Sequence, residues 1–202
     1  MHDKTIIILH GMHQILSDVK YITTGFDKNK TKIIILKGNN SCKKGLSWYT
    51  YYTYKNNYMS HDRINTEHYN FSTKRLVEKI KTESKLIDPK NIHIIGISQG
   101  GTICINAVMH LNFKIGSIFC IDTIFFSDYI NYFFPIRQNF IALISKSDKI
   151  YNPKLQTECY DLLRFFGNDV KIFKRNGSHC ENIKEIKKFI TDFLQKNKLL
   201  KN

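Results

Sequence analysis

The sequence lacks the features of a membrane-anchored or exported protein. No uninterrupted apolar stretch is long enough to span a bilayer, and Met1–Thr5 leads into only four strongly apolar residues, too few for the core of a signal peptide. The five cysteines show no Cys-x-x-Cys spacing, which excludes the usual zinc and redox motifs. We therefore expect a soluble cytoplasmic protein whose thiols are reduced and mostly buried.

Acidic residues are also scarce, since 17 Asp and Glu stand against 31 Lys and Arg and give a formal net charge of +14. The lysines are scattered rather than gathered in one block, which indicates a solvated basic surface. Summed positive charge attracts anionic partners whatever the fold, so weak association with anionic surfaces is expected as an accessory property. We expect no specific nucleic-acid partner, and a monomer or a homodimer.

Neither an internal repeat nor a linker rich in Pro, Gly or Ser divides the chain. Its 202 residues, 42% of them hydrophobic, suit one domain that spans residues 1–202. The end of the chain is rich in Lys and Asn, so residues 195–202 are expected to fray.

Short β-branched runs alternate with amphipathic segments along the chain. The runs are continuously apolar and predict strands covered on both faces, over Thr5–Leu9, Lys32–Leu36, Asn91–Ile97, Ile115–Ile121, Phe140–Ser145 and Val170–Phe173. Helical spacing or boundary residues predict helices over about Ser72–Lys85, from Pro153 to Phe166 with Asn152 as cap, and over Ile183–Leu194. This alternation predicts a three-layer α/β fold, with a mostly parallel central sheet of about six strands flanked by helices.

Glycine is rare, with 10 in the chain, yet three glycines surround Ser98 in the segment Gly96-Ile97-Ser98-Gln99-Gly100-Gly101. Gly-x-Ser-x-Gly between a strand and a helix, here expected over Thr102–Leu111, is typical of a nucleophile elbow, a tight turn that lifts the serine hydroxyl above the sheet. The turn should force Ser98 to a positive φ and bring Gly96 and Gly100 too close to their neighbours for a Cβ. The alternative is an ordinary glycine-rich turn.

A serine nucleophile needs a base, and the base needs an acid that fixes its tautomer. Chain order in elbow folds is serine, acid, histidine, and His179 is the only histidine beyond the last predicted strand. Asp148 and Asp122 each follow a predicted strand, so both are candidates for the acid. We favour Asp148, because its separations from the serine and from the histidine each leave room for a strand and a helix.

Acyl transfer also needs N–H donors for the oxyanion. One is the amide of Gln99, directly after the serine. We expect the second from Met12, because Gly11 lets the loop after the first strand turn toward the site. His10 and His13 lie in the same loop but have no third ligand at a suitable spacing, so we expect no metal.

Two irregular stretches rich in aromatic residues, Gly38–Asn65 and Thr123–Pro135, follow strands and should lie above the carboxyl edge of the sheet. We expect Trp48 and Phe125 to shape an apolar groove that binds the substrate. Core packing is the alternative for both side chains.

With these residues in place, about residues 5–195 resemble the phospholipase/carboxylesterase branch of the α/β-hydrolases, which includes acyl-protein thioesterases and small carboxylesterases. Gly96–Gly101 is similar to the family's Gly-Phe-Ser-Gln-Gly-Gly, His10–Gln14 to its His-Gly-Leu-Gly-Asp, and Ser47-Trp48-Tyr49 to its Ser-Trp-Phe. Three departures are visible. His13 replaces the second glycine of the oxyanion loop, and Ser145-Lys146 stands where the family has His-Gly before the acid. One residue more than the family spacing separates Asp148 from Pro153.

The resemblance implies a triad of Ser98, Asp148 and His179, an oxyanion hole from the amides of Met12 and Gln99, no cofactor and no separate lid domain. It implies a hydrolase of carboxylic esters or thioesters, acting on small molecules or acylated proteins through an acyl-enzyme. Two alternatives stay open: a catalytically idle fold that binds an anionic partner, and a peptidase on the same scaffold.

Overall fold

A six-stranded parallel sheet forms the centre of the protein. A computed structural model describes residues 2–42, 44–51, 64–126 and 136–196. Neighbouring strands pair in parallel in the order β2-β1-β5-β6-β7-β8. These strands are β1 (Lys4–Leu9), β2 (Thr31–Leu36), β5 (Ile92–Ile97), β6 (Ser117–Ile121), β7 (Asn139–Ser145) and β8 (Asp169–Arg175). The predicted parallel α/β sheet is confirmed.

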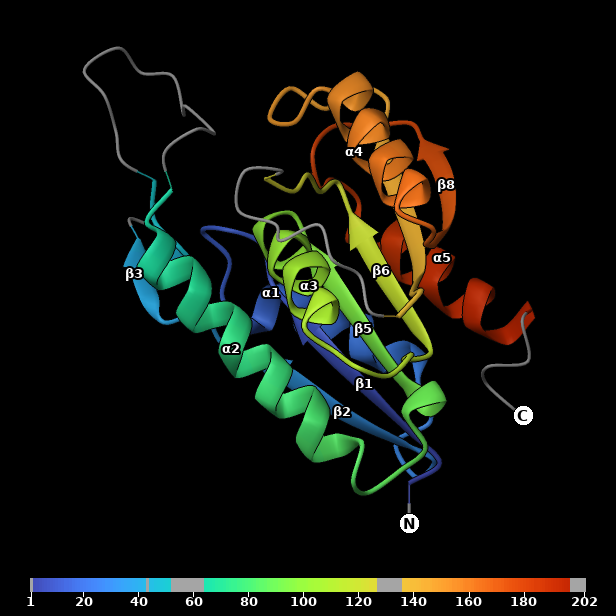
Figure 1. The fold of residues 1–202 in the computed structure, drawn as a ribbon. Coiled ribbons are helices and arrows are strands. Elements are labelled where there is room, and N and C mark those ends of the chain that lie inside the picture. Colours follow the sequence, from blue (N-terminus) through green and yellow to red (C-terminus); the bar gives the residue numbers. More distant parts are fainter. Residues whose placement is uncertain (1, 43, 52–63, 127–135, 197–202) are drawn as a thin grey trace.

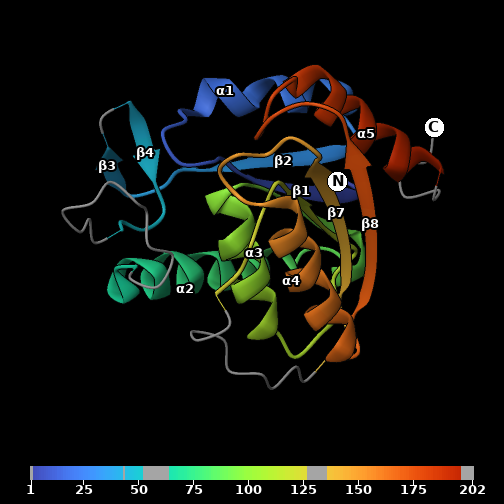
Figure 2. The ribbon, with the colours of Figure 1, turned by 90° about the horizontal axis from the view of Figure 1, so that it is seen from above.

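Helices cover both faces of this sheet (Figures 1 and 2). One face carries α2 (Thr66–Glu83), α3 (Gln99–Met109) and α4 (Pro153–Phe165). The opposite face carries α1 (Leu16–Lys20), a 3-10 turn over Tyr21–Gly25, and α5 (Ile183–Lys196); a second 3-10 turn, Pro89–Asn91, precedes β5. A separate antiparallel hairpin of β3 (Asn40–Cys42) and β4 (Gly45–Ser47), which the sequence patterns did not predict, lies beside the sheet (Figure 2).

The continuous apolar runs arise because successive side chains of each central strand enter different cores. In β1, Ile7 and Leu9 belong to the cluster that packs against α2, α3 and α4, whereas Ile6 and Ile8 belong to the cluster that contains apolar residues of α1 and α5. Side chains alternate between the faces of a strand, so a strand covered on both faces needs apolar residues throughout.

Several predicted boundaries shift in the structure, among them those of three helices. Helix α2 begins at Thr66, earlier than predicted, because the Asn65 side chain accepts the amide of His68 and caps the helix. Helix α3 begins directly after Ser98 rather than at Thr102. Helix α5 continues to Lys196, so residues 195 and 196 are helical, and residues 197–202 lie outside the described residues.

All five cysteines are free. Cys104 and Cys120 are buried, and burial raises the pKa of both thiols. Cys42, Cys159 and Cys180 are partly exposed as whole residues, although burial also raises the pKa of the Cys159 and Cys180 thiols. Within the described ranges, no helix combines the length and the apolar character that crossing a bilayer requires.

The buried histidine of β5 makes folding stability sensitive to mild acid. His93 is buried, neither ring nitrogen has a hydrogen-bond partner in the described part of the chain, and burial, with a smaller effect of Lys4, lowers its pKa to about 4. The unfolded chain regains the ordinary value of 6.5, so stability that is complete above pH 6.5 is lost as the pH falls toward 4. Between pH 7 and pH 5, the free energy of unfolding in urea should fall by about 2 kcal/mol more in the wild type than in His93→Leu.

His110, which is exposed, supplies the control for this experiment. His110→Gln should keep the pH dependence of the wild type, because an exposed imidazole is solvated in both states. If His93→Leu and the wild type lose the same stability between pH 7 and pH 5, burial of His93 is not the cause.

Candidate active site

Ser98 lies in the tight turn between β5 and α3, with φ at +49°, a region that side chains rarely adopt. A Cβ at Gly96 would lie 2.4 Å from the Cα of Gly101, and a Cβ at Gly100 would lie 2.5 Å from the carbonyl oxygen of His10. Helix α3 therefore approaches β5 and the loop after β1 as closely as glycine allows. The turn has the positive φ and the crowded glycines expected of a nucleophile elbow.

Gly100→Ala should lower the free energy of unfolding by about 3 kcal/mol, because the new methyl group would collide with backbone atoms of Leu9 and His10 that cannot turn away. Gly11→Ala is the matched control in the same site. Its Cβ would meet only the end of the Gln14 side chain at 3.0 Å and the Cβ of Ser98 at 3.4 Å, and should cost less than about 1 kcal/mol. Urea denaturation measures both, and equal losses would contradict the steric argument.

Three side chains far apart in the sequence form one hydrogen-bonded chain above the carboxyl edge of the sheet. His179 Nε2 lies 2.8 Å from Ser98 Oγ, and His179 Nδ1 lies 2.7 Å from Asp148 Oδ2. Ser98 follows β5, Asp148 follows β7 and His179 follows β8, so loops at the same edge of the parallel sheet deliver all three. Because a carboxylate only accepts, Nδ1 carries the proton and Nε2 is left to accept the serine O–H.

The carboxylate of Asp148 is held ionised by its neighbours. Burial alone would raise its pKa, but hydrogen bonds from His179 and from the amides of Tyr151 and Ile150 lower the pKa below its ordinary value. The two amides donate to Oδ1 at 2.9 and 2.8 Å, and Gln156 Nε2 donates to Oδ2 at 2.9 Å. The acid is therefore a fixed anion that can orient the imidazole and stabilise its protonated form.

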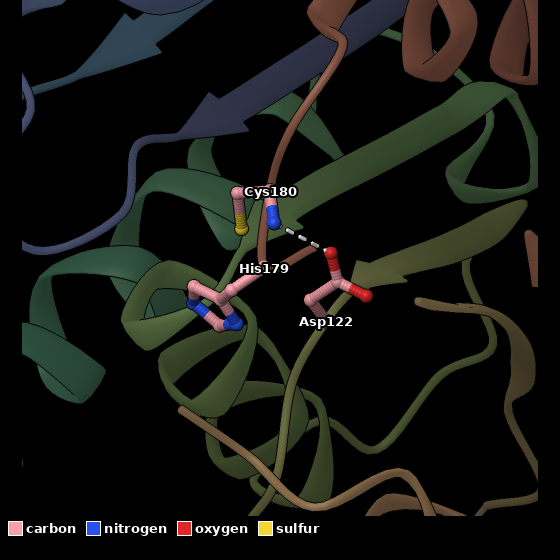
Figure 3. A group of neighbouring side chains, drawn as sticks. All are labelled: Asp122, His179 and Cys180. Carbon is pink, nitrogen blue, oxygen red and sulfur yellow. Dashed lines mark hydrogen bonds between the residues drawn. The ribbon is translucent and has the colours of Figure 1, made fainter. Parts of the chain in front are cut away.

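Asp122, the other candidate acid, is buried at the end of β6 and does not take that place. Both ring nitrogens of His179 already bond to Ser98 and Asp148. Asp122 instead pairs with Arg175 at 3.0 Å and accepts the amide of Cys180 at 2.7 Å (Figure 3).

Ligand atoms of Asp122, His179 and Cys180 lie within 4.8 Å of one another, the spacing of a metal site. The donor chemistry does not fit one. The histidine nitrogens are used by the serine and by Asp148, and the carboxylate oxygens of Asp122 take hydrogen bonds from neighbouring donors. Burial raises the pKa of the Cys180 thiol well above its ordinary value, which disfavours the thiolate that a metal would need.

The loop after β1 passes directly beside the serine, since a Cβ at Gly11 would lie 3.4 Å from the Cβ of Ser98. Among the residues that the structure describes, the amides of Met12 and Gln99 have no hydrogen-bond partner. Gln99 is also the first residue of α3, so the positive end of the helix dipole faces the site. An oxyanion hole formed by these two amides stays a prediction.

The two aromatic residues predicted to bind substrate are both buried in the core. Trp48 is 1% exposed and Phe125 is 6% exposed. The indole of Trp48 donates to the carbonyl of His10 at 2.8 Å, and its amide donates to the side chain of Gln99 at 2.7 Å. Trp48 thus ties the oxyanion loop to the elbow, and substrate contact by either residue stays a prediction. The rest of the two aromatic stretches, residues 52–63 and 127–135, lies outside the described residues.

His13, which stands where the family has a second glycine, adopts a φ of +64°. Its amide donates to the carbonyl of Leu46 at 3.0 Å, and its Nδ1 lies 3.1 Å from the sulfur of Cys42. The β3–β4 hairpin therefore holds this turn in the left-handed region that a glycine would adopt more easily. The ring nitrogens of His10 contact other partners, the carbonyl of Gly11 and the amide of Gly38.

Sequence reasoning missed Tyr151, which lies inside the site. Its ring packs edge-on against His179 at 5.2 Å between centroids, and its hydroxyl lies 3.3 Å from that of Tyr51. Burial and then Tyr51 raise the pKa of the Tyr151 phenol well above its ordinary value, against a hydrogen bond with Ser98 that lowers it. The sequence signal in this segment is the extra residue between Asp148 and Pro153.

The parallel sheet, the elbow after β5 and the loops that carry Ser98, Asp148 and His179 define an α/β-hydrolase. The model of the phospholipase/carboxylesterase family matches residues 1–198, and the chain belongs to that family. A comparison with curated protein sequences found no match.

Solved structures share this fold at low sequence identity. SOBER1 from Arabidopsis thaliana has a TM-score of 0.80 at 18% identity, over 98% of this chain and 99% of that chain. A carboxylesterase from Bacillus cereus has a TM-score of 0.73 at 18% identity, over 96% and 88%. Acyl-protein thioesterase 2 from Zea mays has a TM-score of 0.72 at 14% identity, over 97% and 94%.

Proposed function

We propose that this protein is a serine hydrolase that cleaves carboxylic ester or thioester bonds through an acyl-enzyme. The observation that carries the proposal is the unbroken hydrogen-bonded chain from Ser98 through His179 to the ionised Asp148. The amides of Met12 and Gln99, which have no hydrogen-bond partner in the described part of the chain, support the same chemistry. Membership of the phospholipase/carboxylesterase family also supports it.

Each step moves one proton through the imidazole. Ser98 Oγ attacks the acyl carbon while His179 Nε2 takes its proton, and the amides of Met12 and Gln99 donate to the oxyanion. The intermediate then collapses, the bond to the leaving oxygen or sulfur breaks, and Nε2 returns the proton to it. Water attacks the acyl-enzyme with His179 again as base, which releases the carboxylic acid and restores Ser98.

The family supports the substrate class. Small-molecule esters and acylated proteins are the candidate substrates, because the fold relatives include a carboxylesterase and an acyl-protein thioesterase by name. The basic surface of the chain, with a net charge of +14, would favour acidic acylated partners at low ionic strength.

A fluorophosphonate probe tests the proposal, because it phosphonylates only a serine that its base has activated. We expect the wild type to be labelled and Ser98→Ala and His179→Ala to remain unlabelled, with circular dichroism unchanged. A panel of acyl esters, acyl thioesters and peptides then separates the activities. An unlabelled, well-folded wild type would favour the idle binding protein, and faster cleavage of peptides than of esters would favour the peptidase.

A further inference from the structure

Next to the triad lies a buried ion pair that the proton transfer does not use. Asp122, at the end of β6, and Arg175, the last residue of β8, are joined at 3.0 Å, with side chains 0% and 3% exposed. Asp122 also accepts the amide and the hydroxyl of Ser145 at the end of β7, both at 2.7 Å. The pair therefore connects the carboxyl ends of three adjacent strands.

The same pair holds the chain on both sides of His179. Arg175 Nη2 donates to the carbonyl of Ser178 at 3.0 Å, and Asp122 Oδ2 accepts the amide of Cys180 at 2.7 Å, the bond drawn in Figure 3. The residues directly before and after the histidine are thus tied to one rigid, buried group.

The backbone at these positions needs such support. Asp122 has a φ of +46° and Cys180 a φ of +51°, conformations that side chains other than glycine rarely adopt. Backbone of this kind persists only where surrounding contacts hold it in place. Without the ion pair, the segment Ser178–Cys180 could relax and carry the imidazole away from Ser98.

We propose that Asp122 and Arg175 form a clamp that positions His179 between Ser98 and Asp148. The inference rests on the proposed function, because it assigns the pair a role in the same site. Asp122 acts through the backbone of Cys180 and not on the imidazole, whose two nitrogens bond to the triad partners. Both members of the clamp are positioning residues.

Asp122→Asn tests the clamp with little change of shape. The new NH₂ group replaces either Oδ2, where it faces the donors of Arg175 and Cys180, or Oδ1, where it faces the amide of Ser145. In both orientations two donors oppose each other and Arg175 loses its charged partner, so the anchor of the loop is weakened. We expect kcat for a small activated acyl ester to fall about 100-fold with KM little changed, because a displacement of about 1 Å at the base costs that much. Fluorophosphonate labelling should slow in parallel.

A double-mutant cycle separates positioning from general loss of structure. If the clamp acts through His179, adding Asp122→Asn to His179→Ala should cause no further loss of the residual rate. Glu83→Gln is the matched control, since Glu83 is another buried carboxylate, paired with Lys32 at 2.9 Å but located at the end of α2. It should lower stability and leave kcat unchanged.

The possible results distinguish failure of the clamp from failure of the proposed hydrolase activity. Unchanged kcat in Asp122→Asn, or an equal loss in the wild-type and His179→Ala backgrounds, overturns the clamp while the hydrolase stands. A wild type that neither hydrolyses esters nor takes the probe overturns the proposed function instead. If Asp122→Asn does not fold, Arg175→Lys replaces it in the same cycle, because it keeps the buried charge but loses the planar fork of the guanidinium.

Discussion

Ser98→Ala is expected to lower kcat for an acyl ester by on the order of 10⁶-fold, because it removes the atom that forms the acyl-enzyme in the proposed mechanism. The hydroxyl contributes little to folding, since Ser98 is placed by its backbone and by the glycines around it. The temperature of unfolding should therefore stay close to that of the wild type. Steady-state hydrolysis of a p-nitrophenyl ester and thermal denaturation measure the two quantities.

A double variant tests whether Ser98 and His179 act together. Ser98 and His179 act as one unit across their 2.8 Å contact, so Ser98→Ala/His179→Ala should be no slower than either single variant. Additive losses would mean that the two residues contribute independently, which the triad does not permit. If Ser98→Ala retained more than a small fraction of wild-type activity, another residue would be the nucleophile.

Much of the fold could be predicted because its strands are defined locally. A strand covered by helices on both faces must be apolar throughout, and such runs at Thr5–Leu9 and Asn91–Ile97 agree with β1 and β5 within a residue. The elbow could also be predicted from the sequence, because crowding at Gly96 and Gly100 restricts these positions to glycine. In both cases the physical constraint acts on neighbours in the sequence.

Other features depend on contacts between distant residues, which local patterns do not encode. Spacing placed Asp122 and Asp148 at the ends of neighbouring strands and favoured Asp148, but it did not show which one the imidazole would reach. The structure brings His179 to Asp148 and leaves Asp122 to pair with Arg175. The hairpin of β3 and β4 was missed because its two short strands carry no alternating pattern.

Helix α4 shows the limit of apolar spacing. Apolar residues with helical spacing predict its buried face: Leu155, Cys159, Leu162, Leu163 and Phe166. In the structure Leu155 is 40% exposed, while Gln156 is fully buried. Polar contacts hold Gln156 in this buried position, since its amide nitrogen donates to Asp148 and to the carbonyl of Tyr151. The inner face of α4 therefore carries a polar side chain, Gln156, that bonds to Asp148.

Asp148→Asn should lower kcat by about 10⁴-fold while leaving the fold in place. Each carboxylate oxygen accepts two hydrogen bonds, Oδ1 from the amides of Ile150 and Tyr151 and Oδ2 from His179 and Gln156. If the asparagine oxygen keeps the two backbone amides, its NH₂ group faces the imidazole. The histidine can then bond only by accepting at Nδ1, which places its proton on Nε2, where it can no longer take the proton of the serine.

An exposed carboxylate provides the control for this charge removal. Asp169→Asn removes the same charge from the surface, where Asp169 pairs with Lys114 at 3.1 Å, and should leave kcat within the error of the wild type. The rate of fluorophosphonate labelling should fall in Asp148→Asn alone, because the probe also needs a serine activated by the correct tautomer. A rate equal to that of Asp169→Asn would show that the imidazole is oriented without this carboxylate, and the assignment of the acid would then be wrong.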